Sequence, residues 1–252
     1  MKPTERFSTR AESYRLHRPN YPNEIVDLLR RECNLTSNSL VVDIAAGTGL
    51  LTKIFLESDH QVIAIEPNEQ MRAVCAKLAT RFPQLQCFNA TAEATGLPNH
   101  SVDLITVAQA LHWFQLDQAR AEFARILRPG GWCAVIYNNR QMKGDAFHEG
   151  YERILTEFGI DYLLVQRQHM TSEKLIAFFT PNQMHQAMFP NEQLLDLKAL
   201  EGRIISSSYM PQPGNEKYPA MQAAIKKLFA ANQVDGHARM QYDCIVSYGQ
   251  LA

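Results

Sequence analysis

The stretch LVVDIAAGTG, residues 40 to 49, decides the fold of this chain. Its first half, Leu40 to Ile44, is an apolar run that predicts a buried β-strand. Its second half is a loop of small residues that would open a helix. A strand that feeds such a loop forms the nucleotide crevice of doubly wound sheets, where small residues let a ligand approach the backbone. Taken alone, the same loop could be an ordinary tight turn.

Further apolar runs alternate with helical patterns along the first half of the chain, and a helix is expected from Glu69 and another from Asp117. Apolar strands that alternate with helices in this way indicate a parallel sheet covered on both faces. We therefore predict an α/β fold with a doubly wound, mostly parallel, seven-stranded Rossmann-like sheet. The other expected strands are residues 62–66, 85–90, 102–108, 131–138, 185–194 and 240–248.

The second half of the chain changes character. Residues 141 to 184 have a helical pattern rich in Phe, Tyr, Gln and Met. Helices are also expected from Asp196 and over 216–232, and the last strand should lie near a sheet edge. We predict a single domain over 1–252. Its core would be about 22–140 and 185–252, with a helical cap from 1–21 and about 141–184.

Composition excludes several classes of protein. Lys and Arg total 25 against 26 Asp and Glu, so no basic excess makes nucleic acid the default partner. The five cysteines are irregularly spaced without a CxxC pair, which argues against a disulfide framework and against a metal site. We see neither a secretory signal nor an apolar run of the roughly 18 residues that a membrane span needs. We expect a cytoplasmic protein that contacts no membrane; its oligomeric state stays open.

Two carboxylates sharpen the interpretation of the glycine loop. Asp43 ends the first strand, where its charge would repel a pyrophosphate but suits an ammonium or sulfonium ligand. Glu66 ends the second strand, 23 residues later, where a carboxylate can accept both hydroxyls of a ribose. Together they favour a nucleoside ligand that carries a positive charge.

With these features the chain resembles the class I S-adenosylmethionine-dependent methyltransferases. It is most similar to the small-molecule branch that includes trans-aconitate methyltransferase-like proteins. The matching segments are VVDIAAGTG (41–49), AIEPNEQM (64–71), TAEATGLP (91–98), SVDLITVAQALHWF (101–114), ILRPGG (126–131) and the lead-in FSTRAESYRLHRPNYP (7–22). The chain departs from the family at Ala45, where a glycine is usual. Alanine adds a methyl group near the methionine moiety and requires a φ that alanine tolerates.

The resemblance implies that S-adenosyl-L-methionine is the cofactor, and it assigns the cofactor-binding residues by region. Ala45, Gly47 and Gly49 would form the floor under the methionine part, with Asp43 supporting the loop and facing the amino group. The other residues implied are Glu66 for the ribose; Pro67, Met71, Ala92 and Glu93 for the adenine; Gln109 for the methyl side; and Tyr14 and Arg18 closing over the cofactor.

Ordinary structural roles stay open for some of these residues. Arg18 could be a solvated charge, Met71 a helix core residue, and Asp43 a loop carboxylate.

On the acceptor side, the resemblance implies methyl transfer to a small molecule by in-line displacement. The protein must then align the reactants and exclude water, and it needs a base only for a protonated acceptor. His112 is the candidate catalytic residue, as a base or a hydrogen-bond donor, and Trp113 and Tyr137 are candidates for the acceptor pocket. Each of the three could instead be structural.

Three other functions stay open. A cofactor-binding protein without catalysis would keep the same residues. A nicotinamide-dependent oxidoreductase would share Glu66, but Asp43 and the lack of a full GxGxxG oppose it. A nucleic-acid acceptor would have to use the charged run from Lys2 to Arg18, which is more simply a solvated helix.

Overall fold

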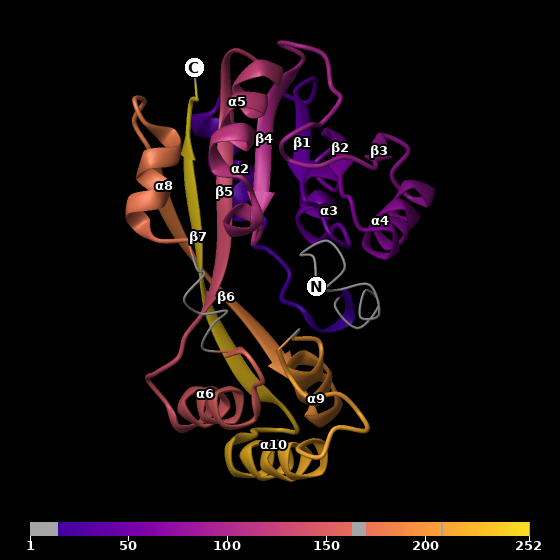
Figure 1. Ribbon diagram of the computed structural model, residues 1–252, viewed down its shortest axis with the longest axis vertical. Helices are drawn as coiled ribbons and strands as arrows, with labels where there is room; N and C mark the ends of the chain where they lie inside the picture. The colour runs from indigo at the N-terminus through magenta and orange to yellow at the C-terminus, as the bar shows by residue number, and fades with distance from the viewer. Residues whose placement is uncertain (1–14, 163–169, 208, 252) are drawn as a thin grey trace.

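The fold is described by a computed structural model that covers residues 15–162, 170–207 and 209–251 (Figure 1). Its sheet has seven strands in the order β3-β2-β1-β4-β5-β7-β6. The first five strands pair in parallel, and β7 is antiparallel to both β5 and β6. This confirms the predicted mostly parallel sheet. The strands are β1 (Leu40–Ile44), β2 (Gln61–Ile65), β3 (Leu85–Phe88), β4 (Val102–Ala108), β5 (Leu127–Arg140), β6 (His185–Leu195) and β7 (Ala238–Gly249).

Helices cover both faces of this sheet. One apolar core joins the sheet to α2 and α3, and the other joins it to α5 and α8. Because both faces are covered, β1 and β4 are buried almost throughout, in agreement with their mainly apolar sequences. The helices are α2 (Glu24–Glu32), α3 (Leu50–Leu56), α4 (Glu69–Ala76), α5 (Leu116–Ile126), α6 (Ala146–Phe158), α8 (Ser172–Phe179), α9 (Leu197–Ile205) and α10 (Tyr218–Asn232), with 3-10 turns η3 (Lys77–Thr80) and η4 (Leu111–Trp113).

Local side-chain chemistry sets several helix starts. Asn68 caps α4 by accepting a 2.9 Å hydrogen bond from the Met71 amide, and Asp196 caps α9 by accepting one of 2.7 Å from the Ala199 amide. The helix expected from Asp117 begins one residue earlier, at Leu116. The fifth strand begins at Leu127, four residues before its expected start, because the chain pairs with β4 through a register shift there.

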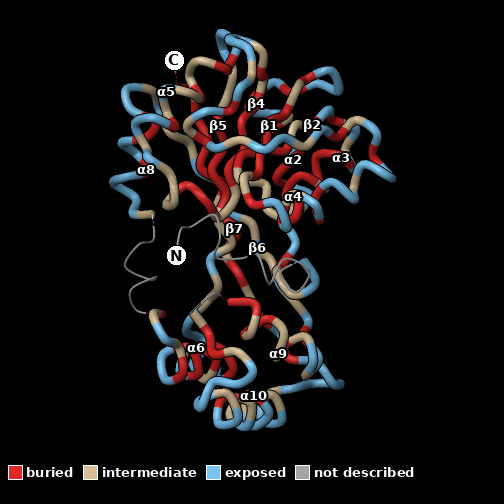
Figure 2. Tube along the Cα trace, turned by 45° about the vertical axis from the view of Figure 1, so that its right-hand side comes forward, coloured by how far each residue is buried: buried red, intermediate tan, exposed pale blue. Residues whose placement is uncertain are grey.

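A second lobe lies below the sheet in Figure 1, where β6, β7 and the end of β5 extend beyond the other strands. There α6, α9 and α10 enclose a separate apolar core that includes Tyr151, Leu200, Ile225 and Tyr242. Figure 2 shows the two buried regions as separate groups of red segments.

Two described helices of the segment 141–184, which was expected to form part of a cap, lie in different regions. Helix α6 joins α9 and α10 in the second lobe, whereas α8 packs against α5 on the main sheet. Periodicity shows that a helix has an apolar face but not which surface that face covers, so this division was not visible in the sequence.

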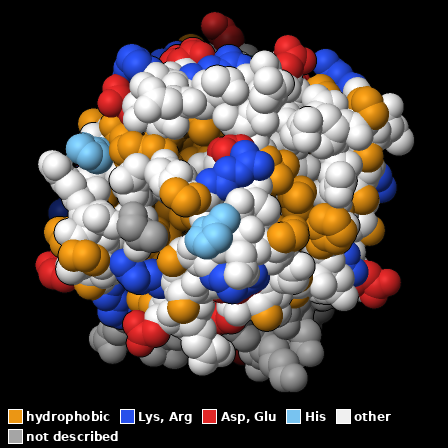
Figure 3. All heavy atoms as spheres, turned by 90° about the horizontal axis from the view of Figure 1, so that it is seen from above, with side chains coloured by type: hydrophobic (Ala, Val, Ile, Leu, Met, Phe, Trp, Pro, Cys, Tyr) orange, Lys and Arg blue, Asp and Glu red, His pale blue; other side chains and the backbone are white. Residues whose placement is uncertain are grey.

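The surface seen from above carries both signs of charge. In Figure 3, Lys and Arg side chains are interspersed with Asp and Glu, and neither sign dominates that face. Among the described helices, none is long and apolar enough to cross a membrane. The location of the protein in the cell stays a prediction.

Candidate functional site

A cavity of about 390 Å³ opens where β1, β2 and β4 end, and this is the edge at which doubly wound sheets bind their ligands. Its wall combines the loop after β1 with the segments that follow β2, β3 and β4. The predicted site residues that line it are Ala45, Gly47, Glu66, Pro67, Met71, Ala92, Glu93, Gln109 and Trp113.

The loop after β1 is held in left-handed conformations. Ala45, Gly47 and Gly49 have φ of 54°, 59° and 82°. A Cβ on Gly47 would meet no atom within 4 Å, whereas one on Gly49 would lie 2.8 Å from Cys75 Sγ. Gly47 therefore leaves room on the cavity side, and Gly49 allows α4 to pack against the start of α3. The φ of Ala45 lies in the region that is strained for alanine by about 1–2 kcal/mol.

Glu66 connects two of the loops around the cavity. Its Oε2 accepts a 2.8 Å hydrogen bond from the Gly47 amide, and its Oε1 accepts one of 2.8 Å from the Asn68 amide. Burial raises the pKa of this carboxyl, and the two amide hydrogen bonds oppose that effect. Because each carboxylate oxygen can accept a second hydrogen bond, Glu66 can bind a vicinal diol while holding both loops.

Asp43 does not line the cavity. It is 1% exposed and lies behind the loop, where it accepts hydrogen bonds from Thr52 Oγ1 at 2.5 Å and Thr106 Oγ1 at 3.0 Å. Burial raises its pKa to about 6, even though both hydroxyls stabilise the charged form. Asp43 thus joins β1, α3 and β4 beneath the loop. The expected contact with a ligand amino group stays a prediction.

Thr48 is a site residue that sequence analysis quoted in the loop without giving it a role. It lines the cavity, and its Oγ1 is buried with no hydrogen-bond partner in the described part of the chain. A buried hydroxyl without a partner is unfavourable by roughly 1–3 kcal/mol. Its position in the loop between Gly47 and Gly49 is the signal that could have indicated it.

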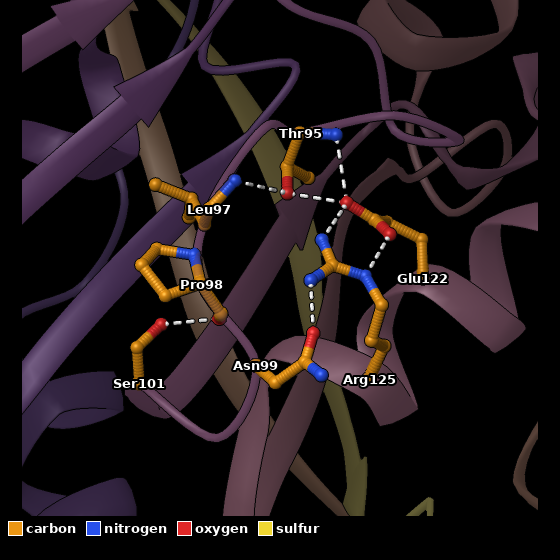
Figure 4. A network of polar contacts seen from close by, with 7 residues as sticks. All are labelled: Thr95, Leu97, Pro98, Asn99, Ser101, Glu122 and Arg125. Carbon is orange, nitrogen blue, oxygen red and sulfur yellow. Dashed lines mark hydrogen bonds and ion pairs between the residues drawn. The ribbon is translucent and has the colours of Figure 1, made fainter.

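The segment after β3 forms one end of the cavity and is anchored from outside it. Glu122 of α5 accepts hydrogen bonds from both the amide and the hydroxyl of Thr95, at 2.8 and 2.5 Å (Figure 4). Arg125 holds the same carboxylate through two contacts of 2.7 Å and donates to Asn99 at 2.6 Å. This network fixes the loop that presents Ala92 to the cavity.

The methyl side of the predicted site is formed after β4. Gln109 lines the cavity with φ 57°, and its Nε2 donates to the Asn138 carbonyl at 3.2 Å. His112 and Tyr137 are brought together, with Nδ1 and Oη 3.4 Å apart, but neither lines the cavity. The His112 ring also lies 4.6 Å from that of Trp113, which does line it. Burial raises the pKa of the Tyr137 hydroxyl.

Of the two residues expected to close over the cofactor, the structure describes Arg18 alone. Arg18 does not line the cavity, and its guanidinium donates to Ser207 Oγ of the second lobe at 3.4 Å. Tyr14 lies outside the described residues.

Ten further residues line the cavity without having been predicted. Most of them neighbour predicted residues within the quoted motifs, so sequence proximity could have found them. They are Tyr21, Ala46, Thr48, Leu50, Leu51, Asn68, Thr91, Ala108, Ala110 and Phe114. Within the described ranges, no group of three His, Cys, Asp or Glu side chains could hold a metal ion.

Comparisons with known proteins point to one family. A family model described as a methyltransferase domain matches residues 42–135. An uncharacterized methyltransferase of Mycobacterium tuberculosis is 34% identical over 206 residues, which cover 80% of this chain and 78% of that protein. An uncharacterized methyltransferase of Schizosaccharomyces pombe is 34% identical over 135 residues, or 53% of each chain. The match thus spans about half the length of this yeast relative.

Solved structures share the fold. One from Anaeromyxobacter dehalogenans, provisionally described as a type II methyltransferase, has a TM-score of 0.68 at 22% identity, over 93% of this chain and 98% of that one. The phosphoethanolamine N-methyltransferase 2 of Haemonchus contortus, solved with phosphomonomethylethanolamine and S-adenosylhomocysteine, has a TM-score of 0.57 at 15% identity. That match covers 98% of this chain and 58% of the other.

Proposed function

This chain belongs to the methyltransferase family, and we propose that it transfers a methyl group from S-adenosyl-L-methionine to a small-molecule acceptor. The observation that carries the proposal is Glu66, which lines the cavity while two backbone amides fix both of its oxygens. A carboxylate fixed in this way at the end of the second strand suits the two hydroxyls of a ribose.

The other cavity residues fit the same cofactor. Gly47 leaves open the space in which a Cβ would stand, and the Thr48 hydroxyl offers a hydrogen bond to a polar group of the ligand. Pro67, Met71 and Ala92 provide an apolar region for a purine. The volume of about 390 Å³ lies within the range of small-molecule sites.

The protein has to position rather than activate the methyl donor. When bound, the cofactor supplies a methyl group on a sulfonium that is already electrophilic. The residues of the chain bind and orient it and keep water away from it. Gln109 and Trp113 line the cavity after β4, next to the place where the acceptor would enter.

His112 is proposed as the base or hydrogen-bond donor that a protonated acceptor would need. Its Nδ1 lies 3.4 Å from Tyr137 Oη, so the pair can share a proton, and its ring lies 4.6 Å from that of Trp113, which lines the cavity. A carboxylate acceptor needs no such group. The ratio of rates for His112→Gln and wild type should therefore depend on which acceptor is used.

The function is tested by calorimetry with S-adenosylmethionine and S-adenosylhomocysteine. We expect micromolar binding by wild type and by Glu57→Ala, and loss of binding by Glu66→Ala. Glu57 is a suitable control because the one ion pair of its side chain with a described residue is an exposed one, with Lys53. No binding of either ligand at millimolar concentration would refute the proposal, and saturable NADH binding instead would favour an oxidoreductase.

A further inference from the structure

Arg203 is a largely buried cation that has no charged partner in the described part of the chain. This α9 residue is 7% exposed, and its Nε donates a weak 3.4 Å hydrogen bond to Tyr242 Oη. Within the described ranges its guanidinium forms no ion pair and makes no other hydrogen bond. Burying a charge without an oppositely charged partner is unfavourable, so an anionic ligand would complete the surroundings of this side chain.

A second arginine of the same lobe shows the contrast. Arg140, at the end of β5, pairs with the Glu152 carboxylate and lies over the Tyr151 ring at 4.6 Å. Glu152 also accepts a 2.7 Å hydrogen bond from Tyr162 Oη. The lobe therefore neutralises Arg140 from within its own sequence and does not do so for Arg203.

The surroundings of Arg203 are rich in hydroxyl groups. Burial acts to lower the pKa of Arg203, and the neighbouring Tyr242, Tyr151 and Tyr209 outweigh that effect and raise it. Tyr242 Oη also donates to Gln193 Oε1 at 2.7 Å, which fixes that hydroxyl and holds the Nε edge of the guanidinium. The two terminal nitrogens then stay available as the paired donors with which arginine binds a carboxylate or phosphate.

The sheet connects this group to the wall of the cavity. Tyr242 is paired in register with Arg140 of β5, two residues beyond Asn138, whose carbonyl accepts the hydrogen bond from Gln109. Two strand residues span about 7 Å. Tyr242, which bonds to Arg203, thus lies on the strand beside β5, two positions further along than the residue that Gln109 contacts.

The lead-in segment, residues 15 to 22, connects the same two places. The His17 ring packs directly on Gly202, the residue before Arg203, and Arg18 donates to Ser207 four residues after it. The segment then passes Asn20, whose carbonyl accepts from the Asn191 side chain at 2.7 Å, and reaches Tyr21, which lines the cavity. In Figure 1 this indigo segment runs between the sheet and α9.

We propose that Arg203 binds a non-reacting anionic group of the methyl acceptor, a carboxylate or a phosphate, and so selects anionic acceptors. The proposal rests on the proposed function, because it is the acceptor that would bring the anion. Arg203 would act as a specificity residue: it holds the far end of the acceptor while the reacting end lies near Gln109.

The test uses Arg203→Met, which keeps the length of the side chain and removes the charge. Arg239→Met is the matched control, because Arg239 of β7 is a 63% exposed arginine of the same lobe. Binding of glutarate and of phenyl phosphate is measured by calorimetry at constant ionic strength, with and without saturating S-adenosylhomocysteine. We expect at least one probe to bind wild type and Arg239→Met, and to bind Arg203→Met at least tenfold more weakly.

Thermal unfolding separates this role from a structural one. Removing an unpaired buried charge should leave the Tm of Arg203→Met unchanged or raise it, and the affinity for S-adenosylhomocysteine should change less than twofold. The proposal is overturned if neither probe binds wild type, if both bind Arg203→Met equally well, or if that variant is markedly less stable. Measurements without S-adenosylhomocysteine keep this result separate from a failure of the proposed cofactor. Preference for glutarate or phenyl phosphate identifies the anion as a carboxylate or a phosphate.

Discussion

The Gly47 amide donates a 2.8 Å hydrogen bond to the carboxylate of Glu66, a residue 19 positions later in the sequence. The bond links the loop after β1 to the loop after β2, and the Asn68 amide holds the other oxygen of the same carboxylate at 2.8 Å. A ligand that binds Glu66 therefore meets a loop that is already in place.

Replacing Glu66 by glutamine should weaken cofactor binding. One of the two backbone amides would then face an amide NH2 in place of an acceptor oxygen, so the loop would lose a hydrogen bond and the ribose an acceptor. We expect the Kd for S-adenosylhomocysteine to rise about 10- to 100-fold, corresponding to about 1.4 to 2.8 kcal/mol. Calorimetry would show this, and a Kd within twofold of wild type would contradict the role of Glu66.

The two loop glycines should respond differently to alanine. Gly49→Ala places a methyl group 2.8 Å from both Cys75 Sγ and Leu78 Cδ1 at φ 82°, so the free energy of unfolding should fall by about 2 kcal/mol or more. Gly47→Ala meets no atom and should be less destabilised, by about 1 kcal/mol. Its methyl group would instead occupy ligand space and raise the Kd for S-adenosylhomocysteine at least tenfold. Urea unfolding and calorimetry measure the two effects, and equal behaviour of the variants would refute this distinction.

Replacing Ala45 by glycine should stabilise the folded protein. At φ 54° the alanine is strained by about 1–2 kcal/mol, whereas glycine adopts this conformation freely and loses some stability only through its more flexible unfolded state. We expect the free energy of unfolding of Ala45→Gly, measured with urea, to be about 1 kcal/mol higher than that of wild type. Ala46→Gly is the control, because Ala46 has a negative φ. The free energy of unfolding of this variant should fall by about 0.5–1 kcal/mol. A loss in both variants would show that residue 45 is unstrained.

The sequence was most informative where local rules and tertiary structure agree. The mainly apolar runs of β1 and β4 predicted a buried parallel sheet because strands covered on both faces are mainly apolar. Gly47 and Glu66 were expected at the same edge of the sheet because they follow the first and the second strand, and both line the cavity.

Other residues depended on packing between distant segments. Asp43 has a carboxylate at the expected strand end, but Thr52 and Thr106 bind it behind the loop, and nothing in the local pattern shows that contact. Arg203 stands on an amphipathic helix as an ordinary basic residue, and it becomes a buried cation only when the second lobe assembles. The division of the expected cap has the same cause.

Asp43 should make stability fall as pH rises. Its pKa of about 6 is higher than the ordinary 3.8, so the folded state binds the proton more tightly. The stabilisation is complete below about pH 4 and is lost as pH rises through 6. Because one pKa unit corresponds to about 1.4 kcal/mol, the loss is on the order of 3 kcal/mol. In urea unfolding, the free energy of unfolding of Asp43→Asn should rise relative to that of the ligand-free wild type as pH increases from 4.5 to 8. A difference independent of pH would contradict this.

Glu122 should show the opposite dependence on pH. Its hydrogen bonds from Arg125 are the main reason that its pKa lies at about 2, below the ordinary 4.5, so the charged carboxylate stabilises the folded state. That contribution is present above pH 4.5 and is lost as pH falls toward 2. Glu122→Gln removes the ion pair with Arg125 and weakens the anchor of Thr95, so we expect a loss of about 1–2 kcal/mol at pH 7.

The control for this variant is Glu57→Gln, which breaks the 3.1 Å exposed pair with Lys53 and should change stability by less than about 0.5 kcal/mol. Urea unfolding between pH 3 and 7 should show the Glu122→Gln difference shrinking as pH falls, while the control stays flat. If the difference persisted at pH 3, it would come from the shape of the side chain, and the charge of the Glu122–Arg125 pair would not be what holds the loop after β3.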